Sequence, residues 1–160
     1  MEKKQIQIEY TELPVSELSG ADKRLYDAAL DASVFAYAPY SRFQVGAAAL
    51  LENGTIVPGS NQENAAYPSG LCAERVALFA AGALFPGMPV VALAIIAQSD
   101  SLVQDAITPC GACCQVMKET EMVSKHPMRI LLCGRNTVRI LPSVSALLPF
   151  AFSADELSSK

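Results

Sequence analysis

The stretch YPSGLCAERVALFAAGALFPGMPVVALAIIAQ, residues 67–98, contains the elements that decide the fold. A loop with proline and glycine leads into residues 72–84, whose alanine-rich composition is helical and unbroken. The sequence FPGMP ends this helix, and a continuous apolar run from Val90 to Ala97 follows, which is typical of a buried strand. Loop, helix and buried strand in this order predict a helix that crosses over a sheet.

The chain before this stretch predicts another helix and a hairpin. The helix begins after Ser19, which has Asp22 three residues later in a capping-box-like arrangement, and apolar residues at helical spacing continue to Phe35. Asn53 and Gly54 form a strong hairpin-turn signal between two segments that favour strand. After residue 98, Pro109 indicates the start of another helix, and residues 143–152 predict a short helix near the end of the chain.

The strands predicted from these patterns number five. They cover residues 43–52, 55–64, 90–97, 128–134 and 137–141. With helices between them, they predict an α/β fold, a three-layer α/β/α sandwich around a five-stranded mixed sheet. Residues 4–10 alternate weakly and predict an edge strand or an arm, so we divide the chain into an N-terminal extension, residues 1–21, and a catalytic domain, residues 22–160.

Charge and composition limit the classes of partner. A chain of 160 residues fits one domain, and its formal net charge of -4 gives no general attraction for nucleic acid or anionic membranes. The longest apolar run is well short of the roughly 20 residues that cross a bilayer, and the N-terminus lacks the apolar core of a signal peptide. We therefore expect a cytoplasmic protein whose partners are small molecules or proteins.

Three of the five cysteines lie at predicted helix entrances. Cys72 begins one helix, and Cys110 and Cys113 begin the next. Because helices that follow neighbouring parallel strands begin at the same edge of a sheet, we expect the three thiols to converge. Zinc suits such a point, since three protein ligands with an open fourth position are typical of a catalytic zinc site.

Two charged residues follow Cys72 closely. At a helix entrance the Glu74 carboxylate can lean towards the open side of the metal without being a ligand, as a proton carrier must. Arg75 can fold back to donate to a ligand sulfur and withdraw charge from it. The sequence thus predicts an acid/base group and a compensating cation beside the thiols.

These motifs resemble one enzyme family. C-A-E-R followed by P-C-x-x-C, the long stretch AYAPYSRFQVGAAALLENGTIVPGSNQENAAYPSGLCAER, and LLPFAF near the end are similar to the zinc-dependent cytidine deaminases of the homotetrameric, three-cysteine type. The resemblance implies one zinc ion per subunit, held by Cys72, Cys110 and Cys113, with Glu74 as general acid/base and Arg75 beside the ligands. It also implies hydrolytic deamination of cytidine and 2′-deoxycytidine in pyrimidine nucleoside salvage, by a homotetramer whose sites are shared between subunits.

The same resemblance implies a set of substrate-binding residues. Asn61 and Glu63 match the pair that holds the ribose hydroxyls, and their spacing of two places both on one face of a strand. A carboxylate with an amide makes a suitable clamp for a sugar 3′-hydroxyl. The remaining members are Phe43, Tyr67, Ala73 and Phe152. Of these, Phe152 matches the aromatic residue that reaches a neighbouring subunit.

Several alternatives remain at this point. Cys114 stands where the family usually has arginine; it points about 100° away from Cys113 around the helix, but its i,i+4 spacing from Cys110 makes it a second candidate ligand, and we favour Cys113. Cys133 is interpreted as an inert core residue, although as a fourth thiolate it would make a purely structural zinc module without turnover. A deaminase of a polynucleotide base or of another aminopyrimidine is the third hypothesis. The acidic charge disfavours a polynucleotide, and the Asn61 and Glu63 pair favours a free nucleoside.

Overall fold

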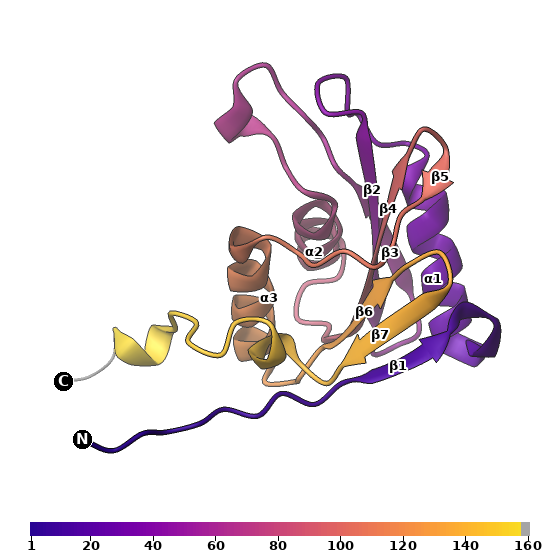
Figure 1. Cartoon of the computed structure of the whole chain (residues 1–160). Helices are drawn as coiled ribbons and strands as arrows, with labels where there is room; N and C mark the ends of the chain where they lie inside the picture. Colours follow the sequence, from indigo (N-terminus) through magenta and orange to yellow (C-terminus); the bar gives the residue numbers. More distant parts are fainter. Residues whose placement is uncertain (158–160) are drawn as a thin grey trace.

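A mixed sheet forms the centre of the computed structural model, which describes residues 1–157 (Figure 1). The seven strands in these residues are β1 (Thr11–Pro14), β2 (Phe43–Leu51), β3 (Ile56–Ser60), β4 (Val90–Ser99), β5 (Leu102–Val103), β6 (Arg129–Cys133) and β7 (Thr137–Leu141). Their order is β1-β7-β6-β4-β2-β3, and β5 pairs with β4. The β4–β6 pair is parallel, and the other pairs are antiparallel.

Helices cover both faces of the sheet. They are α1 (Gly20–Ser33), α2 (Ala73–Leu84) and α3 (Gly111–Ser124), with short 3-10 turns at Val15–Glu17, Tyr67–Ser69, Val144–Ala146 and Ala154–Glu156. Alternation along β4 divides the core, because Leu93 and Ile95 pack with α2 and α3 while Ala94 and Ile96 pack with α1. Figure 1 shows α1 on one side of the sheet and α2 and α3 on the other. The predicted three-layer fold is confirmed.

The sheet has two more strands than predicted. Of the edge strand or arm predicted at residues 4–10, the structure shows the arm, because residues 1–10 are exposed and β1 begins only at Thr11. β1 and β5 consist of four and two residues, and each exists because it pairs with a longer strand. The predicted closing helix is reduced to the single 3-10 turn Val144–Ala146. The division at residue 21 stays a prediction, and residues 158–160 of the predicted domain lie outside the described residues.

The ends of α1 also differ from the prediction. Ser19 is the N-cap residue, but its side chain makes no capping hydrogen bond. Asp22 instead forms an ion pair with Arg129, with 2.6 Å between its Oδ2 and the Arg129 Nη2. The helix ends at Ser33, so Phe35 lies beyond it and is exposed instead of completing the apolar face.

The sheet topology brings the starts of α2 and α3 to one edge. Both β3 and β4 are antiparallel to β2, so they run in the same direction on either side of it. Since α2 follows β3 and α3 follows the β4–β5 segment, the two helices begin at the same edge. The predicted convergence is therefore correct, although the two strands are not neighbours as we expected.

Close packing fixes α2 against the sheet. Gly59 in β3 lies directly under this helix, and a Cβ at Gly59 would come within 2.7 Å of the Ala73 carbonyl oxygen and would overlap the Ala77 backbone nitrogen. Only a residue without a side chain permits this approach. Gly59 therefore sets the height of the α2 N-terminus above the sheet. Within residues 1–157, the longest apolar helical segments are too short to cross a membrane.

Candidate active site

Three thiols meet where α2 and α3 begin. Cys72 is the N-cap residue of α2, Cys110 is the N-cap residue of α3, and Cys113 lies in the first turn of α3. Their sulfur atoms all lie within 4.8 Å of one another, with 4.0 Å from Cys72 to Cys110 and 3.5 Å from Cys110 to Cys113. Three converging soft donors at two helix N-termini fit a zinc ion in donor type and number.

The two other cysteines stand apart from this cluster. Cys114 is buried in the core below α3, and its Sγ lies 3.9 Å from the Pro109 carbonyl oxygen. Cys133 is fully buried on the opposite face of the sheet, among the residues that pack against α1. Burial raises the pKa of Cys133 to about 12, as expected for an inert core thiol. Neither position suits a ligand of the cluster, so the geometry argues against a four-thiolate structural module.

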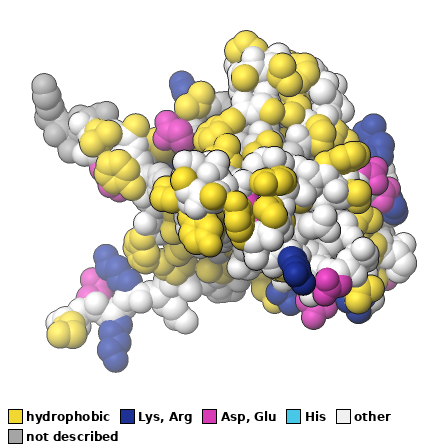
Figure 2. Space-filling model, turned by 90° about the horizontal axis from the view of Figure 1, so that it is seen from above, with side chains coloured by type: hydrophobic (Ala, Val, Ile, Leu, Met, Phe, Trp, Pro, Cys, Tyr) yellow, Lys and Arg dark blue, Asp and Glu magenta, His cyan; other side chains and the backbone are white. Residues whose placement is uncertain are grey.

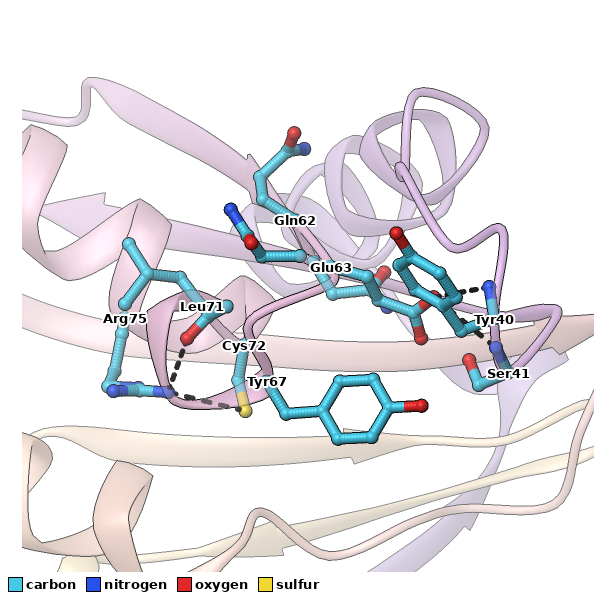
Figure 3. A pocket seen from close by; sticks show the side chains of 11 residues that line it. Tyr40, Ser41, Gln62, Glu63, Tyr67, Leu71, Cys72 and Arg75 are labelled. Carbon is cyan, nitrogen blue, oxygen red and sulfur yellow. Dashed lines mark hydrogen bonds between the residues drawn. The ribbon is translucent and has the colours of Figure 1, made fainter.

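The cluster favours negative charge on the sulfur of Cys72. The hydrogen bond from Cys113, joined by contacts from Arg75 and Cys110, lowers the pKa of Cys72 to about 5 against the effect of burial. The same hydrogen bond, together with burial, raises the pKa of Cys113. The Arg75 Nη2 lies 3.9 Å from the Cys72 Sγ and 3.4 Å from the Gly70 carbonyl oxygen (Figure 3). Arg75 thus lies where the sequence places it, beside a thiolate.

Glu74 is a buried carboxyl group in the first turn of α2. It is 4% exposed, and this burial raises its pKa. The nearby Cys72 charge raises the pKa further, whereas a hydrogen bond with Cys113 and the charge of Arg75 lower it. The carboxyl group therefore lies against the thiol cluster, as predicted, in surroundings that favour a bound proton.

A pocket of about 490 Å³ opens beside Cys72 and Arg75 (Figure 3). Its wall carries two aromatic rings, Tyr40 and Tyr67, which meet edge to face with 6.0 Å between their centroids. The lining residues are Tyr40, Ser41, Asn61, Gln62, Glu63, Asn64, Tyr67, Gly70, Leu71, Cys72 and Arg75. Three predicted substrate-binding residues, Asn61, Glu63 and Tyr67, are thus brought together with the first predicted zinc ligand.

Hydrogen bonds hold the Glu63 carboxylate in this pocket. Its Oε2 accepts the backbone N–H groups of Tyr40, at 2.8 Å, and of Ser41, at 3.3 Å. These bonds, and above all one from the Ser41 side chain, lower the pKa of Glu63. The carboxylate is therefore ionised at neutral pH and can only accept hydrogen bonds.

The other predicted substrate-binding residues lie outside this lining. Phe43 is the half-buried first residue of β2, and Ala73 is buried as the first residue of α2. Phe152 is 55% exposed on the C-terminal segment, where its carbonyl oxygen accepts a 2.8 Å hydrogen bond from the Gln115 side chain. Sequence reasoning missed Tyr40, Ser41, Gln62, Asn64, Gly70 and Leu71 as lining residues, although each lies within three residues of a predicted one.

A family model described as "Cytidine and deoxycytidylate deaminase zinc-binding region" matches residues 19–128. The chain belongs to this family. A cytidine deaminase from Halalkalibacterium halodurans is 40% identical to it over 139 residues, which cover 81% of this chain and 92% of the relative. A cytidine deaminase from Mycobacterium tuberculosis is 39% identical over 132 residues, covering 81% and 87%.

Solved structures of the deaminases agree with this relationship. The crystal structure of cytidine deaminase from Burkholderia pseudomallei matches with a TM-score of 0.70 and 41% identity, covering 81% of this chain and 98% of that one. The cytidine deaminase family, the fold class and the zinc cofactor predicted from the sequence are thereby confirmed, and the three predicted thiols converge in the structure. The homotetramer stays a prediction.

Proposed function

We propose that the protein catalyses the hydrolytic deamination of cytidine and 2′-deoxycytidine to uridine and 2′-deoxyuridine, with release of ammonia. The observation that carries this proposal is the meeting of three thiols and one buried carboxyl group at two helix N-termini, beside an open pocket. Family membership supports the reaction class, because the matched relatives are named cytidine deaminases. Such an enzyme would serve pyrimidine nucleoside salvage.

Zinc would be held by Cys72, Cys110 and Cys113. When bound, it would supply the Lewis acid that makes water a nucleophile at neutral pH. The choice of Cys113 over Cys114 is supported by the sulfur distances, since Cys113 belongs to the cluster and Cys114 points to the Pro109 carbonyl. The N-terminal ends of α2 and α3 favour the anionic sulfurs. Arg75 would withdraw charge from Cys72, which offsets the formal excess of three thiolates over one divalent cation.

Glu74 would move the protons of the reaction. It would accept a proton from the attacking water and deliver it to N3 of the cytosine ring while the water oxygen adds at C4. The remaining proton of the added oxygen is then transferred to the amine nitrogen, the C4–N4 bond breaks, and the C4 carbonyl of uridine and ammonia are formed. Its burial supports this role, because a raised pKa makes it easier for the carboxylate to take up a proton during the reaction.

The pocket would hold the nucleoside by its sugar and its base. Glu63 and Asn61 would bind the ribose hydroxyls, with Tyr67 as a wall, while Phe43 would pack on the base and the Ala73 N–H would meet the pyrimidine edge. The ionised Glu63 would repel a phosphate group nearby, so CMP should be a poor substrate. An acidic chain with this pocket also favours a free nucleoside over a polynucleotide.

We further propose that the enzyme is a homotetramer in which Phe152 reaches the site of a neighbouring subunit. The C-terminal segment projects from the body (Figure 2), and Phe150 and Phe152 on it are 86% and 55% exposed. Exposed aromatic residues on a projecting segment suit an interface between subunits. Light scattering coupled to size-exclusion chromatography tests this assembly. The cytoplasmic location and the boundary at residue 21 stay predictions.

One experiment tests the proposed reaction directly. Purified protein is incubated with cytidine, 2′-deoxycytidine or CMP, and the loss of cytosine absorbance is followed with the release of ammonia. We expect turnover of both nucleosides, loss of turnover after treatment with a zinc chelator, and recovery after zinc is added back. Absence of turnover by the zinc-loaded protein would refute the proposed function.

A further inference from the structure

The turn before β2 holds the pocket carboxylate from one side. Tyr40 and Ser41 are consecutive in the chain, and both backbone N–H groups point to the same oxygen of Glu63, Oε2, at 2.8 and 3.3 Å (Figure 3). Because both bonds use Oε2, the second oxygen, Oε1, is left for a ligand. An ionised carboxylate offers only acceptor sites, so the matching ligand group is a hydroxyl donor.

Local hydrogen bonds fix the shape of this turn. The Arg42 N–H donates to the Ala38 carbonyl oxygen at 3.0 Å, and Arg42 itself has a φ of 57°, in the left-handed region. The Ser41 side-chain oxygen accepts the N–H of Phe43 at 3.0 Å, which is the usual way for a serine hydroxyl to close a turn. This bond closes the turn beside the two backbone N–H groups that hold Glu63.

The Ser41 hydroxyl therefore connects two parts of the pocket. It accepts the backbone N–H of Phe43, where β2 begins, and so fixes the turn of Tyr40 and Ser41, whose two N–H groups hold Glu63. A side chain that ties this turn to the start of β2 determines where the carboxylate lies relative to that strand. Preorganisation of this kind lowers the cost of binding without a contact to the substrate.

We propose that Ser41 is a positioning residue that holds Glu63 by one carboxylate oxygen, so that the other oxygen accepts the 3′-hydroxyl of the nucleoside. The proposal rests on the proposed function for the identity of the ligand, but it goes beyond it by assigning a role to a residue that acts through Glu63. It predicts that the contribution of Ser41 depends on the presence of a single hydroxyl group on the sugar.

The test compares one variant with the wild type on two substrates. Ser41→Ala is compared with the wild type on cytidine and on 3′-deoxycytidine, which lacks only the hydroxyl in question. With cytidine, we expect kcat/KM to fall about tenfold through a higher KM, with kcat nearly unchanged. With 3′-deoxycytidine, the wild type is already roughly a hundredfold slower, because Glu63 is left unpaired, and Ser41→Ala should change it less than about twofold.

Matched variants separate positioning from a general loss of structure. Ser41→Thr keeps the hydroxyl and should restore most of the cytidine activity. Ser16→Ala makes the same chemical change at an exposed serine outside the pocket and should leave both substrates unaffected. An equal loss by Ser41→Ala on both substrates, or failure of Ser41→Thr to restore activity, would overturn the proposal, because a structural defect does not distinguish one sugar hydroxyl.

A binding measurement keeps this test independent of turnover. Calorimetric titration with uridine and 3′-deoxyuridine should show the same pattern, with Ser41→Ala weakening only the uridine complex. If the zinc-loaded wild type fails to deaminate cytidine but this pattern holds, the proposed reaction is wrong and the role of Ser41 stands. If the wild type binds and converts the 3′-deoxy compounds as well as the normal ones, Glu63 does not bind the hydroxyl and the inference is overturned.

Discussion

The Asn61 side chain donates its amide to the carbonyl oxygen of Phe43 over 2.9 Å, and its Oδ1 accepts the N–H of Val45 over 2.8 Å. It thus continues the hydrogen-bond ladder of β2 past the end of β3. Asn61 was predicted as a sugar-binding residue, and the structure adds this architectural contact. We expect Asn61→Ala to lower the free energy of unfolding by about 1–3 kcal/mol, because two backbone groups lose their partners. The same variant should raise KM for cytidine.

Urea unfolding and steady-state kinetics measure the two effects of Asn61→Ala separately. Asn136→Ala is the matched control, since it makes the same chemical change at an exposed asparagine outside the pocket. A variant Asn61→Ala with wild-type stability would contradict the architectural role of the amide.

The zinc ligands can be assigned by replacing adjacent cysteines. Cys113→Ser should lose most of its zinc, because the sulfur that completes the cluster is removed. Cys114→Ser should keep a full equivalent, since Cys114 lies in the core with its sulfur near the Pro109 carbonyl. Metal content is measured by mass spectrometry on freshly purified protein. A full equivalent of zinc in Cys113→Ser, with loss in Cys114→Ser, would reverse the assignment.

A substitution at Glu74 distinguishes metal binding from proton transfer. Glu74→Gln keeps the size of the side chain and removes its ability to carry a proton, so we expect full zinc content and a fall in kcat of about a thousandfold. Glu119→Gln makes the same change on the exposed side of α3 and should be fully active. Comparable rates for Glu74→Gln and the wild type would eliminate Glu74 as the proton carrier.

Alanine substitutions at two glycines, one under α2 and one within it, should change the free energy of unfolding in opposite directions. Gly59→Ala places a methyl group against the helix backbone, which should destabilise the protein by about 1–3 kcal/mol and disturb the Cys72 end of α2. Gly82→Ala lies within α2 and meets open space, so better helix propensity should stabilise the protein by up to about 1 kcal/mol. Chemical denaturation checks both variants, and equal effects would contradict the packing described for Gly59.

Much of the site could be predicted because its residues follow regular elements. The buried runs and helix entrances around Cys72 and Cys110 are local patterns, and the rule that connects them to one sheet edge is general. The turn at Tyr40 and Ser41 carries no such pattern, because its contact to Glu63 joins residues 22 or 23 positions apart. The short strands β1 and β5 were missed for the same reason, since only their partners make them strands.

The division of the thiols between two helices has a consequence for the stability of the whole chain. Cys72 and Cys110 are 38 residues apart, so an ion bound by both closes a long loop and cross-links α2 to α3. Removing zinc would then loosen the fold as well as stop the chemistry. Cells short of zinc would hold less of the enzyme, because the metal-free chain unfolds more readily and is then degraded by proteases.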